Sequence, residues 1–594
     1  MPRSNPGHSA SISIRPGVVV NVGHFAVLCA GLTSLTALTG CRSDTALDAQ
    51  INRLTSTQSI LLGRQTLAPV ERFDDPKGID RPGMDERHPP SVNPDAEELL
   101  FPVSRSDVDV ARTLDRYKSL DAGATMSIDL KEAFRIAQRN SREYLTAEEE
   151  YTLASISLLI ERHQWGPRFF GTTTLGVSGD ATGSSDIPLN IINELLVTKR
   201  LQSGGSIEAR AIWNATEQLR TTATEDYVQS TAIVLSGDVP LLRGAGPTAR
   251  ESLIQSERNL VYAARNFERF RRSFHVSIAR DYFSLVNQLN SIANTEKSIE
   301  SLKRSFDRTT ALVKAGRTRS FEVQQVEASV LQRQATLINQ RESYVVALDR
   351  FKIRLGIPMS TSIEIVPSTL DLPVPDVTPT QASMLAINYR LDLQNRRDQL
   401  NDFRRAVRNR RNDLLPDLDL NAAVTFNTDD GRNVGGFRFD PSDTMYNAGV
   451  TFGFPLDRKI ERLNLRSSLI AMNRALRDFE EFRDNVILSA RQSRRAIDQQ
   501  RLNHQLAVRQ VENNRLTVKE FELREGKVDI FDLIRAEDNL LVAENDRDIA
   551  EQSLQVSVLD YLLTTGQLRI SRDGTLSMPH IPLPDPPGQP PATP

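Results

Sequence analysis

The chain has 594 residues, of which 39% are hydrophobic, 25% are charged and only 6% are aromatic. This balance excludes a wholly disordered chain, and the few aromatic residues argue against a string of compact β-domains. A net charge of −3 gives no electrostatic signature of nucleic-acid binding. Both cysteines, Cys29 and Cys41, fall in the first 41 residues, so the rest of the chain has no thiol for disulfide bonds, metal ligation or catalysis.

The first 40 residues have the pattern of a secretory signal peptide. Two arginines precede a mostly apolar run, and this run leads into Leu38-Thr39-Gly40-Cys41. These four residues resemble the lipobox of bacterial lipoproteins, which implies that Cys41 is the acylated first residue of the mature chain and carries fatty acids such as palmitate. A single transmembrane anchor is the alternative, although Asn21 and His24 are costly at membrane depth. Arg42 stands where an aspartate would retain a lipoprotein at the inner membrane, which favours the outer membrane.

Two segments outside the main body of the chain look irregular. Residues 41–125 are punctuated by prolines and have weak apolar periodicity, which predicts a linker. Residues 569–594 are rich in proline, so most of this segment is neither helix nor central strand and is expected to be an extended tail.

Between these segments the chain contains two copies of one pattern. Residues 316–323 match 526–533 at an offset of 210, and two matches further upstream have offsets of 249 and 215. The copies therefore span 126–357 and 378–568, with a linker at 358–377. The change from 249 to 215 gives the first copy 34 extra residues, which we expect to enlarge a loop over about 182–226. Two long copies indicate a duplication rather than a solenoid.

Each copy is expected to begin with a helix that ends at a proline, Pro167 or Pro416, and to continue with two strands. In the second copy, even-numbered apolar residues alternate with polar ones over 417–427 and 445–454. The first copy has a weaker version over 169–180 and 227–239. Strands of nine or ten residues with one apolar face fit transmembrane β-strands, so the chain is expected to contribute four.

Proline-free stretches of more than 100 residues follow the strands of each copy. Apolar residues spaced alternately by three and four predict coiled-coil helices. Gly316 and Gly526 are expected to break these helices at an equatorial position, with the hairpin turns near Asn290 and Gln500. About 45 residues from strand to turn would then span about 70 Å.

In this combination the chain resembles the outer-membrane efflux channel (TolC-like) family, in its lipoprotein branch. The resemblance covers 126–568. It rests on the lipobox, the duplicated order of elements, the junctions Leu-Leu-Pro-Asp-Leu and Phe-Pro-Leu at 414–418 and 454–456, and the Gly-x-x-x-Ile-Phe-Asp-Leu-Ile segment at 526–534. It implies an α+β membrane protein, in which a homotrimer forms a twelve-stranded outer-membrane β-barrel continuous with a long coiled-coil α-helical barrel.

The resemblance also implies a function. The family conducts exported molecules passively from the periplasm across the outer membrane of Gram-negative-type bacteria, in tripartite efflux or type I secretion systems. Its partners are a periplasmic adaptor (membrane fusion) protein, an inner-membrane transporter and the lipid of the outer membrane. The competing hypothesis is a periplasmic coiled-coil structural or adaptor lipoprotein without channel activity, which does not account for two pairs of membrane-length strands.

No catalytic, cofactor or metal site is predicted, because the histidines are scattered and no glycine-rich phosphate loop precedes a helix. The Arg-rich stretch 404–411 is expected to be an exposed helix face; the alternative is that it lies near the membrane, where it would repel cations or meet lipid phosphates. The offset of 210 places Glu512 and Arg509 opposite Leu302 and Ile299, which are seam positions in the first copy. In the family, acidic rings in the corresponding helix narrow the periplasmic entrance and favour cations, so Glu512 and Arg509 are the candidate pore-entrance residues. The alternative is an ordinary Arg509–Glu512 surface ion pair.

Overall fold

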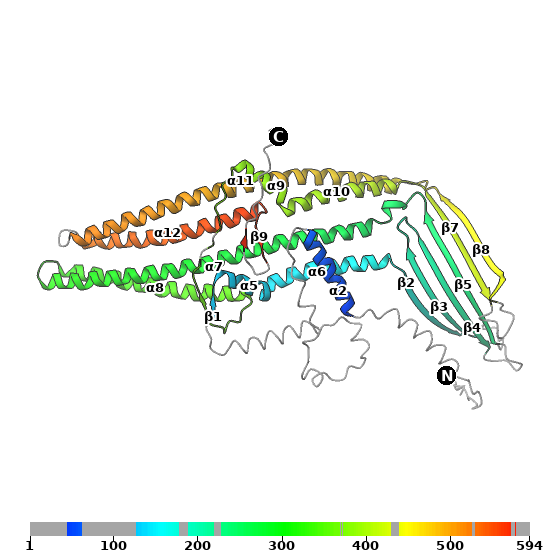
Figure 1. Cartoon of the computed structure of the whole chain (residues 1–594), viewed down its shortest axis with the longest axis horizontal. Helices are drawn as coiled ribbons and strands as arrows, with labels where there is room; N and C mark the ends of the chain where they lie inside the picture. Colours follow the sequence, from blue (N-terminus) through cyan, green and yellow to red (C-terminus); the bar gives the residue numbers. More distant parts are fainter. Residues whose placement is uncertain are drawn as a thin grey trace, which may run out of the picture.

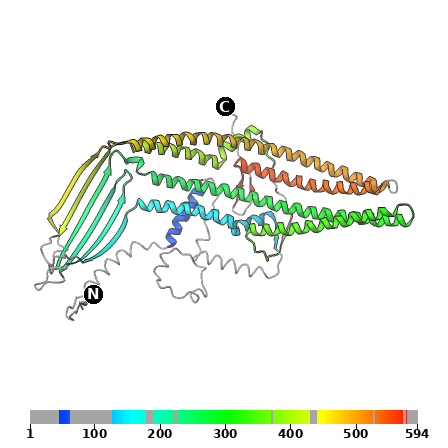
Figure 2. The ribbon, with the colours of Figure 1, turned by 180° about the vertical axis from the view of Figure 1, so that it is seen from behind.

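The computed structural model describes residues 44–61, 126–177, 188–218, 227–368, 370, 372–428, 439–524, 529–571 and 576–577. The long strands gather at one end, and long helices extend from them to the other end (Figures 1 and 2). The predicted signal peptide over 1–40, the predicted lipidation site Cys41, Gly526 and the tail from 578 onward lie outside the described residues.

The two copies contain the same helices in the same order. The first copy has α5 (Leu130–Asn140), α6 (Arg142–Gln164), α7 (Glu251–Lys314) and α8 (Ser320–Leu355). The second copy has α9 (Pro379–Tyr389), α10 (Leu391–Asn412), α11 (Lys459–Leu523) and α12 (Ile530–Thr564). Among the helices that the structure describes, none combines the length and the apolar character needed to span a bilayer.

Each copy begins with two helices where the sequence predicted one. The backbone is extended at Ser141, with ψ of 126°, and at Arg390, with ψ of 116°. These two positions differ by the repeat offset of 249, so the break belongs to the duplicated unit. A glycine with positive φ lies against each break: a Cβ at Gly356 would collide with a carbonyl before the first break, and a Cβ at Gly566 would lie 2.7 Å from the carbonyl oxygen of Tyr389.

The predicted position of the hairpin turns was wrong. α7 runs through Asn290 without interruption for 64 residues, or about 96 Å, and α11 runs through Gln500 for 65 residues. Neither helix contains a glycine or proline that would favour a turn at these places. The first turn lies at Gly316, where a φ of 68° places the residue in the left-handed region that ends helices. Gly316 is therefore at the tip of the hairpin and not at an equatorial break.

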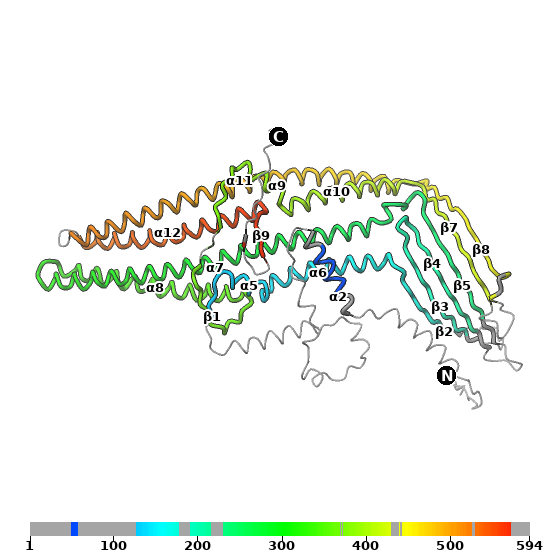
Figure 3. Tube along the Cα trace, viewed as in Figure 1, coloured from blue at the N-terminus to red at the C-terminus, as the bar shows by residue number. Residues whose placement is uncertain are grey.

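The sheet has six strands rather than the predicted four (Figure 3). Its order is β2 (Arg168–Val177), β3 (Pro188–Arg200), β4 (Ser206–Gln218), β5 (Tyr227–Pro240), β7 (Asp417–Thr428) and β8 (Phe439–Gly453), and all neighbours are antiparallel. The four predicted strands are present as β2, β5, β7 and β8. The difference lies in the stretch predicted as an enlarged loop, which contains the hairpin β3–β4. Its alanines at 209, 211 and 215 give little apolar contrast, so the period of two is weak there.

The segments predicted as linkers also contain regular structure. Helix α2 (Asp44–Leu61) lies in the N-terminal linker and contacts α6, where the Tyr151 hydroxyl donates a hydrogen bond to the Thr55 carbonyl at 3.0 Å. In the inter-repeat linker, β6 (Ile363–Ile365) pairs in parallel with β1 (Met126–Ile128). In the predicted tail, β9 (Arg569–Ile570) pairs with β10 (Leu576–Ser577).

The main hydrophobic core lies midway along the helices. It joins α5, α6 and α7 to the ends of α8 and α12, and its largest fully buried side chains include Tyr282, Tyr561 and Phe274. Aromatic rings stack between α6 and α7, with the Tyr151 and Phe267 centroids 5.7 Å apart. This core fixes the helices relative to one another, so the sheet and the hairpin tips are held at opposite ends of one body.

Candidate channel wall and periplasmic entrance

Strands β7 and β8 have one apolar face and one polar face. The register places apolar residues opposite each other on one side of the sheet: Leu418 and Phe452, Leu420 and Val450, Ala422 and Ala448, Val424 and Tyr446. Val450 is 64% exposed, so no described part of the chain covers this face. On the other face, the Asn421 amide donates a hydrogen bond to the Thr451 hydroxyl at 3.1 Å. The apolar face that the alternation predicted is therefore one continuous surface.

The strands of the first copy continue the same apolar face. The registers carry it onto odd-numbered residues: Phe169, Leu175, Ile191, Leu195, Val197, Ile207, Ala209, Ala211, Trp213, Ala215, Ile233, Leu235 and Val239. Polar residues interrupt it at Thr231, at Lys199 near the end of β3, and at Thr173 and Asn193, where the Thr173 hydroxyl donates a hydrogen bond to the Asn193 side chain at 2.9 Å. Because a hydrogen-bonded polar pair costs less to bury than an unpaired one, this surface remains suited to an apolar environment.

The opposite face of the sheet carries the paired charged side chains, together with the apolar Ile192, Leu196, Ile212 and Val234. Glu194 and Arg210 form an ion pair there, with 3.2 Å between the Nε and Oε1 atoms. The Ser206 hydroxyl donates to an Asp238 carboxylate oxygen at 2.6 Å, and Asp419 continues this face on β7. Such a division into one apolar and one polar face is the pattern of a transmembrane barrel wall with water on its inner side.

The junction between sheet and helices is held by side chains that bind backbone groups. The Asn412 carbonyl oxygen accepts a hydrogen bond from the Gly244 amide at 2.7 Å, and its amide donates to the Leu242 carbonyl at 3.1 Å. Arg458 donates to the Leu414 carbonyl at 2.9 Å. These contacts link the loop after β5 to the end of α10, so the two copies meet in a fixed geometry where strands become helices.

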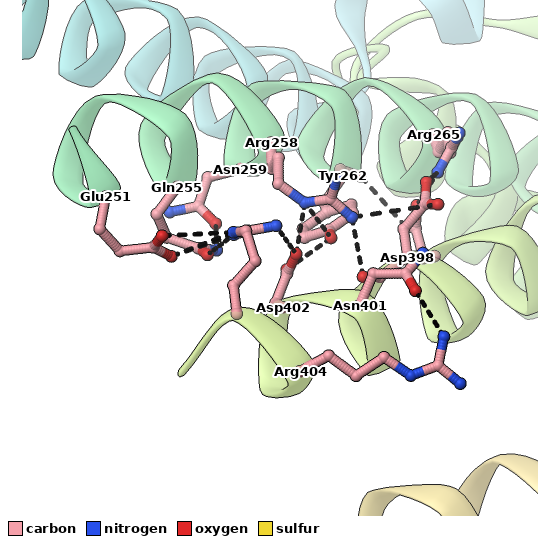
Figure 4. A network of polar contacts seen from close by, with 12 residues as sticks. Glu251, Gln255, Arg258, Asn259, Tyr262, Arg265, Asp398, Asn401, Asp402 and Arg404 are labelled. Carbon is pink, nitrogen blue, oxygen red and sulfur yellow. Dashed lines mark hydrogen bonds and ion pairs between the residues drawn. The ribbon is translucent and has the colours of Figure 1, made fainter. Parts of the chain in front are cut away.

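A polar network next to this junction joins α7 of the first copy to α10 of the second (Figure 4). Arg405 pairs with Glu251 at 3.2 Å and with Asp402 at 2.8 Å. The Tyr262 hydroxyl donates to the other oxygen of Asp402 at 2.6 Å. The pKa of Tyr262 is raised to about 12, mainly by burial and secondly by this hydrogen bond. The phenol therefore remains a donor at physiological pH and helps to hold α10 on α7.

This network changes the interpretation of the Arg-rich stretch 404–411. Arg408 and Arg411 are exposed, as predicted, but Arg405 is a partly buried part of the interface. Arg265 adds an ion pair with Asp398 at 2.6 Å. The acidic residues are four positions apart on α10, and that spacing was the available sequence signal that one face of α10 meets a cationic partner.

A second set of polar contacts joins the first hairpin to α12 towards the tip. The Asn294 amide donates to Asp548 at 2.9 Å, and the Ser301 hydroxyl donates to Glu537 at 2.8 Å. Arg333 of α8 pairs with Asp538 of α12. Burial is the main cause that raises the pKa of Glu537 to about 7; the Ser301 hydrogen bond opposes this rise, and the neighbouring carboxylates add to it. The sequence analysis did not find this carboxylate.

The predicted entrance residues lie on α11. Glu512 and Arg509 are both exposed, so the entrance role and the surface ion pair both stay predictions. Their neighbours Val511 and Val518 are buried, and α11 packs along α12. Glu512 therefore lies on the exposed side of α11, while Leu302 at the matching position of the first copy is buried.

At both lateral edges of the body, a strand edge and apolar helix surfaces have no partner among the described residues. Among the described strands, β2 and β8 each pair on one side only. Exposed apolar residues recur at multiples of seven on the helices at these edges: Leu153 and Ile160 on α6, Leu331, Ile338 and Val345 on α8, and Leu488, Leu502, Leu516 and Leu523 on α11. This spacing is typical of a coiled-coil seam that meets a partner helix.

The described residues contain no group of three or more His, Cys, Asp or Glu side chains arranged to hold a metal ion. His275 is buried, contacts the Gln138 amide at 2.8 Å, and has its pKa lowered to about 4 by desolvation. A neutral histidine in such a position is part of the core packing.

No family model matches the sequence, and no curated protein matches it. Solved structures do match. They include the CmeC outer membrane channel of Campylobacter jejuni, with a TM-score of 0.55 and 16% identity over 74% of this chain and 85% of that chain. The outer-membrane channel OprN has a TM-score of 0.55 and 18% identity over 74% of this chain and 89% of that chain. The open state of the MtrE outer membrane channel of Neisseria gonorrhoeae has a TM-score of 0.54 and 13% identity over 74% of this chain and 88% of that chain. The chain therefore has the TolC-like fold of outer-membrane efflux channels.

Proposed function

We propose that this chain is a subunit of a homotrimeric outer-membrane channel that conducts exported molecules passively from the periplasm to the outside. One observation carries the proposal: a single sheet with an apolar and a polar face continues directly into long helices, and both edges of this body are unpaired. Open strand edges are not tolerated in lipid, so a membrane-inserted sheet of this kind must close with further copies.

The edges suit closure by head-to-tail assembly. β2 and β8 are the first and last of six antiparallel strands, so β8 of one copy runs antiparallel to β2 of the next. The same step brings the exposed seam of α11 against the seams of α6 and α8. Repeated rotation by the same angle closes a ring, in which the polar faces line a lumen.

The finer parts of the proposal extend the resemblance to the efflux-channel family. The trimer would work with a periplasmic adaptor protein and an inner-membrane transporter, in a tripartite efflux or type I secretion system. It would reside in the outer membrane, with a lipid on Cys41 as an additional anchor. It is not an enzyme, because its role is to provide a path for molecules that the transporter drives.

Conductance and assembly are the direct test. Protein purified from outer membranes should migrate as a heat-modifiable trimer and should form ion-conducting pores in planar bilayers. A monomer that binds membranes without conductance would favour the structural or adaptor lipoprotein instead. That alternative leaves the six membrane-length strands unexplained.

The anchor is tested separately by intact-mass spectrometry. We expect a lipid-modified Cys41 at the N-terminus and no residues 1–40. The Cys41→Ser variant should keep the signal peptide or lose the lipid mass, and an unmodified N-terminus in the wild type would contradict the lipid anchor.

A further inference from the structure

The hairpin β3–β4 is inserted between two strands that pair directly in the simpler arrangement of the second copy. β3 pairs with β2 through ten consecutive residue pairs, and β4 pairs with β5 through twelve. Neither register shows a bulge. The hairpin is therefore built into the wall of the sheet and does not fold over it.

The turn of this hairpin is fixed at the helical end of the sheet. Gly204 and Gly205 have φ of 103° and 80°, which favours glycine. A Cβ on Gly205 would collide with the carbonyl of Asp238, and the Gly246 amide donates a hydrogen bond to the Ser203 carbonyl at 2.8 Å. The turn is thus packed against the end of β5 and the start of the helical region.

The inserted strands follow the inside–outside rule of the rest of the sheet. Their residues on the apolar face are Ile191, Leu195, Val197, Ile207, Ala209, Ala211, Trp213 and Ala215; the polar exceptions are Asn193, which is hydrogen-bonded to Thr173, and Lys199 near the helical end of β3. Their polar face carries the Glu194–Arg210 ion pair. Each strand has 13 residues, which exceeds the length of about 9–11 residues that spans a bilayer at a tilt of about 45°.

We infer that β3 and β4 are membrane-spanning strands of the barrel wall, so that the assembled channel has eighteen strands and a wider outer-membrane section than the twelve expected from the sequence. This inference rests on the proposed trimer. Because barrel diameter grows roughly linearly with strand number, eighteen strands give a diameter about 1.5-fold that of twelve at the same tilt. The helices beneath are unchanged in number, so the added width belongs to the membrane section.

Tryptophan fluorescence tests the location of the inserted hairpin. The chain has two tryptophans, Trp165 and Trp213, and Trp213 lies on the apolar face of β4. In the Trp165→Phe variant, reconstituted in vesicles of phosphatidylcholine with brominated acyl chains, Trp213 emission should fall at least two-fold relative to unbrominated lipid.

The matched control moves the tryptophan by one residue. In Trp165→Phe/Ile212→Trp/Trp213→Phe, the new indole lies on the polar face, opposite Glu194, and should be quenched weakly. Equal quenching at both positions, or quenching at neither, would overturn the inference. The result is independent of conductance: a conducting channel with an unquenched Trp213 refutes the hairpin placement alone, whereas a quenched Trp213 without conductance refutes the channel alone.

Strand number is tested by electron cryomicroscopy of the wild type and of a deletion of residues 187–220. The odd-numbered residues of β2 and β5 lie on the same face, so these strands can pair directly once the 34 residues are removed. We expect eighteen strands in the wild type and twelve in the deletion variant. Twelve strands in the wild-type barrel wall, with β3–β4 outside it, would contradict the inference even if the deletion variant does not fold.

Discussion

The two copies differ little in their helices and greatly in their strands. α7 and α11 have 64 and 65 residues, and α8 and α12 have 36 and 35. The first copy nevertheless contributes four strands to the sheet, and the second contributes two. The two copies thus have hairpins of the same length but contribute different numbers of described strands to the sheet.

Packing explains why these two regions tolerate change differently. The helices of the hairpins pack against several other helices, so a change in one helix would shift its seam relative to each of them. A sheet accepts an added hairpin more easily, because two extra strands restore both the strand direction and the inward and outward faces. One extra strand would reverse the chain direction and place the following helix on the wrong side of the membrane.

Charged substitutions on the two faces of the sheet should have the largest effects. Val450→Arg in β8 and Leu195→Arg in β3 each place a cation on the apolar face, which should cost up to about 2–4 kcal/mol at midplane depth and prevent insertion. Thr451→Arg, on the polar face, is the control and should be tolerated. Heat-modifiable trimer in outer-membrane fractions is the measurement. Tolerance of Leu195→Arg but not of Val450→Arg would show that the two copies do not share one wall.

Gly356 and Gly566 lie at equivalent positions of the two copies and test whether both copies need a glycine there for the same steric reason. Alanine at either position combines a positive φ with a backbone collision, at a total cost of about 2–4 kcal/mol. Gly316→Ala is the matched control, because Gly316 also has a positive φ but open space around it, and should cost about 1–2 kcal/mol. Denaturant unfolding in detergent measures the three variants. Equal losses in all three would assign the effect to φ alone.

Two carboxylates at matching positions should respond differently to pH. Glu537 of α12 is 5% exposed, and Glu327, at the offset of 210, is exposed. The pKa of Glu537 is raised from 4.5 to about 7, so the folded state binds its proton more tightly than the unfolded state does. Stability should therefore fall as pH rises from about 4.5 to about 7, by about 3 kcal/mol in total.

Hydrogen exchange near the hairpin tips measures this response. After correction for intrinsic rates, protection of α12 around Glu537 should be greater at pH 5 than at pH 8. Glu537→Gln should remove the dependence, and Glu327→Gln should leave it unchanged. A wild-type profile that is flat between these pH values would mean that Glu537 is ionised at little cost beside Ser301 and Arg304.

The sequence predicts most of what depends on local pattern. The strands of the second copy stand out because large apolar residues such as Val450 and Phe452 alternate with polar ones. The inserted strand β4 is harder to recognise, since alanines occupy much of its apolar face. The helix breaks at Ser141 and Arg390 have no proline or glycine to mark them, and their equivalence appears only through the repeat offset.

The features that the sequence does not predict are contacts between distant parts of the chain. The network around Arg405 joins residues about 150 positions apart, and the Ser301–Glu537 hydrogen bond joins residues 236 apart. Neither pairing follows from spacing along one helix. The hairpin tip was misplaced for a related reason: a coiled-coil seam predicts where helices pack, whereas only the glycine with positive φ determines where the chain turns back.

The smallest effect is expected at the candidate entrance, where charged residues of the second copy match apolar residues of the first. Leu302 of the first copy is 1% exposed, whereas Glu512 of the second copy is exposed. In the proposed trimer, three Glu512 carboxylates lie around one axis. If they line the lumen they should attract cations without changing the fold, so Glu512→Gln should lower the cation-to-anion permeability ratio and leave trimer stability unchanged.

The ionic-strength dependence separates this ring from a residue on the outer surface. The Debye length is about 10 Å at 0.1 M salt and about 3 Å at 1 M, so the difference between wild type and Glu512→Gln should shrink in single-channel recordings as salt rises. Arg509→Gln is the matched control. It removes a cation three residues away and should shift selectivity in the opposite direction if both side chains face the lumen. Unchanged selectivity in both variants at low salt would place the two residues outside the conducting path.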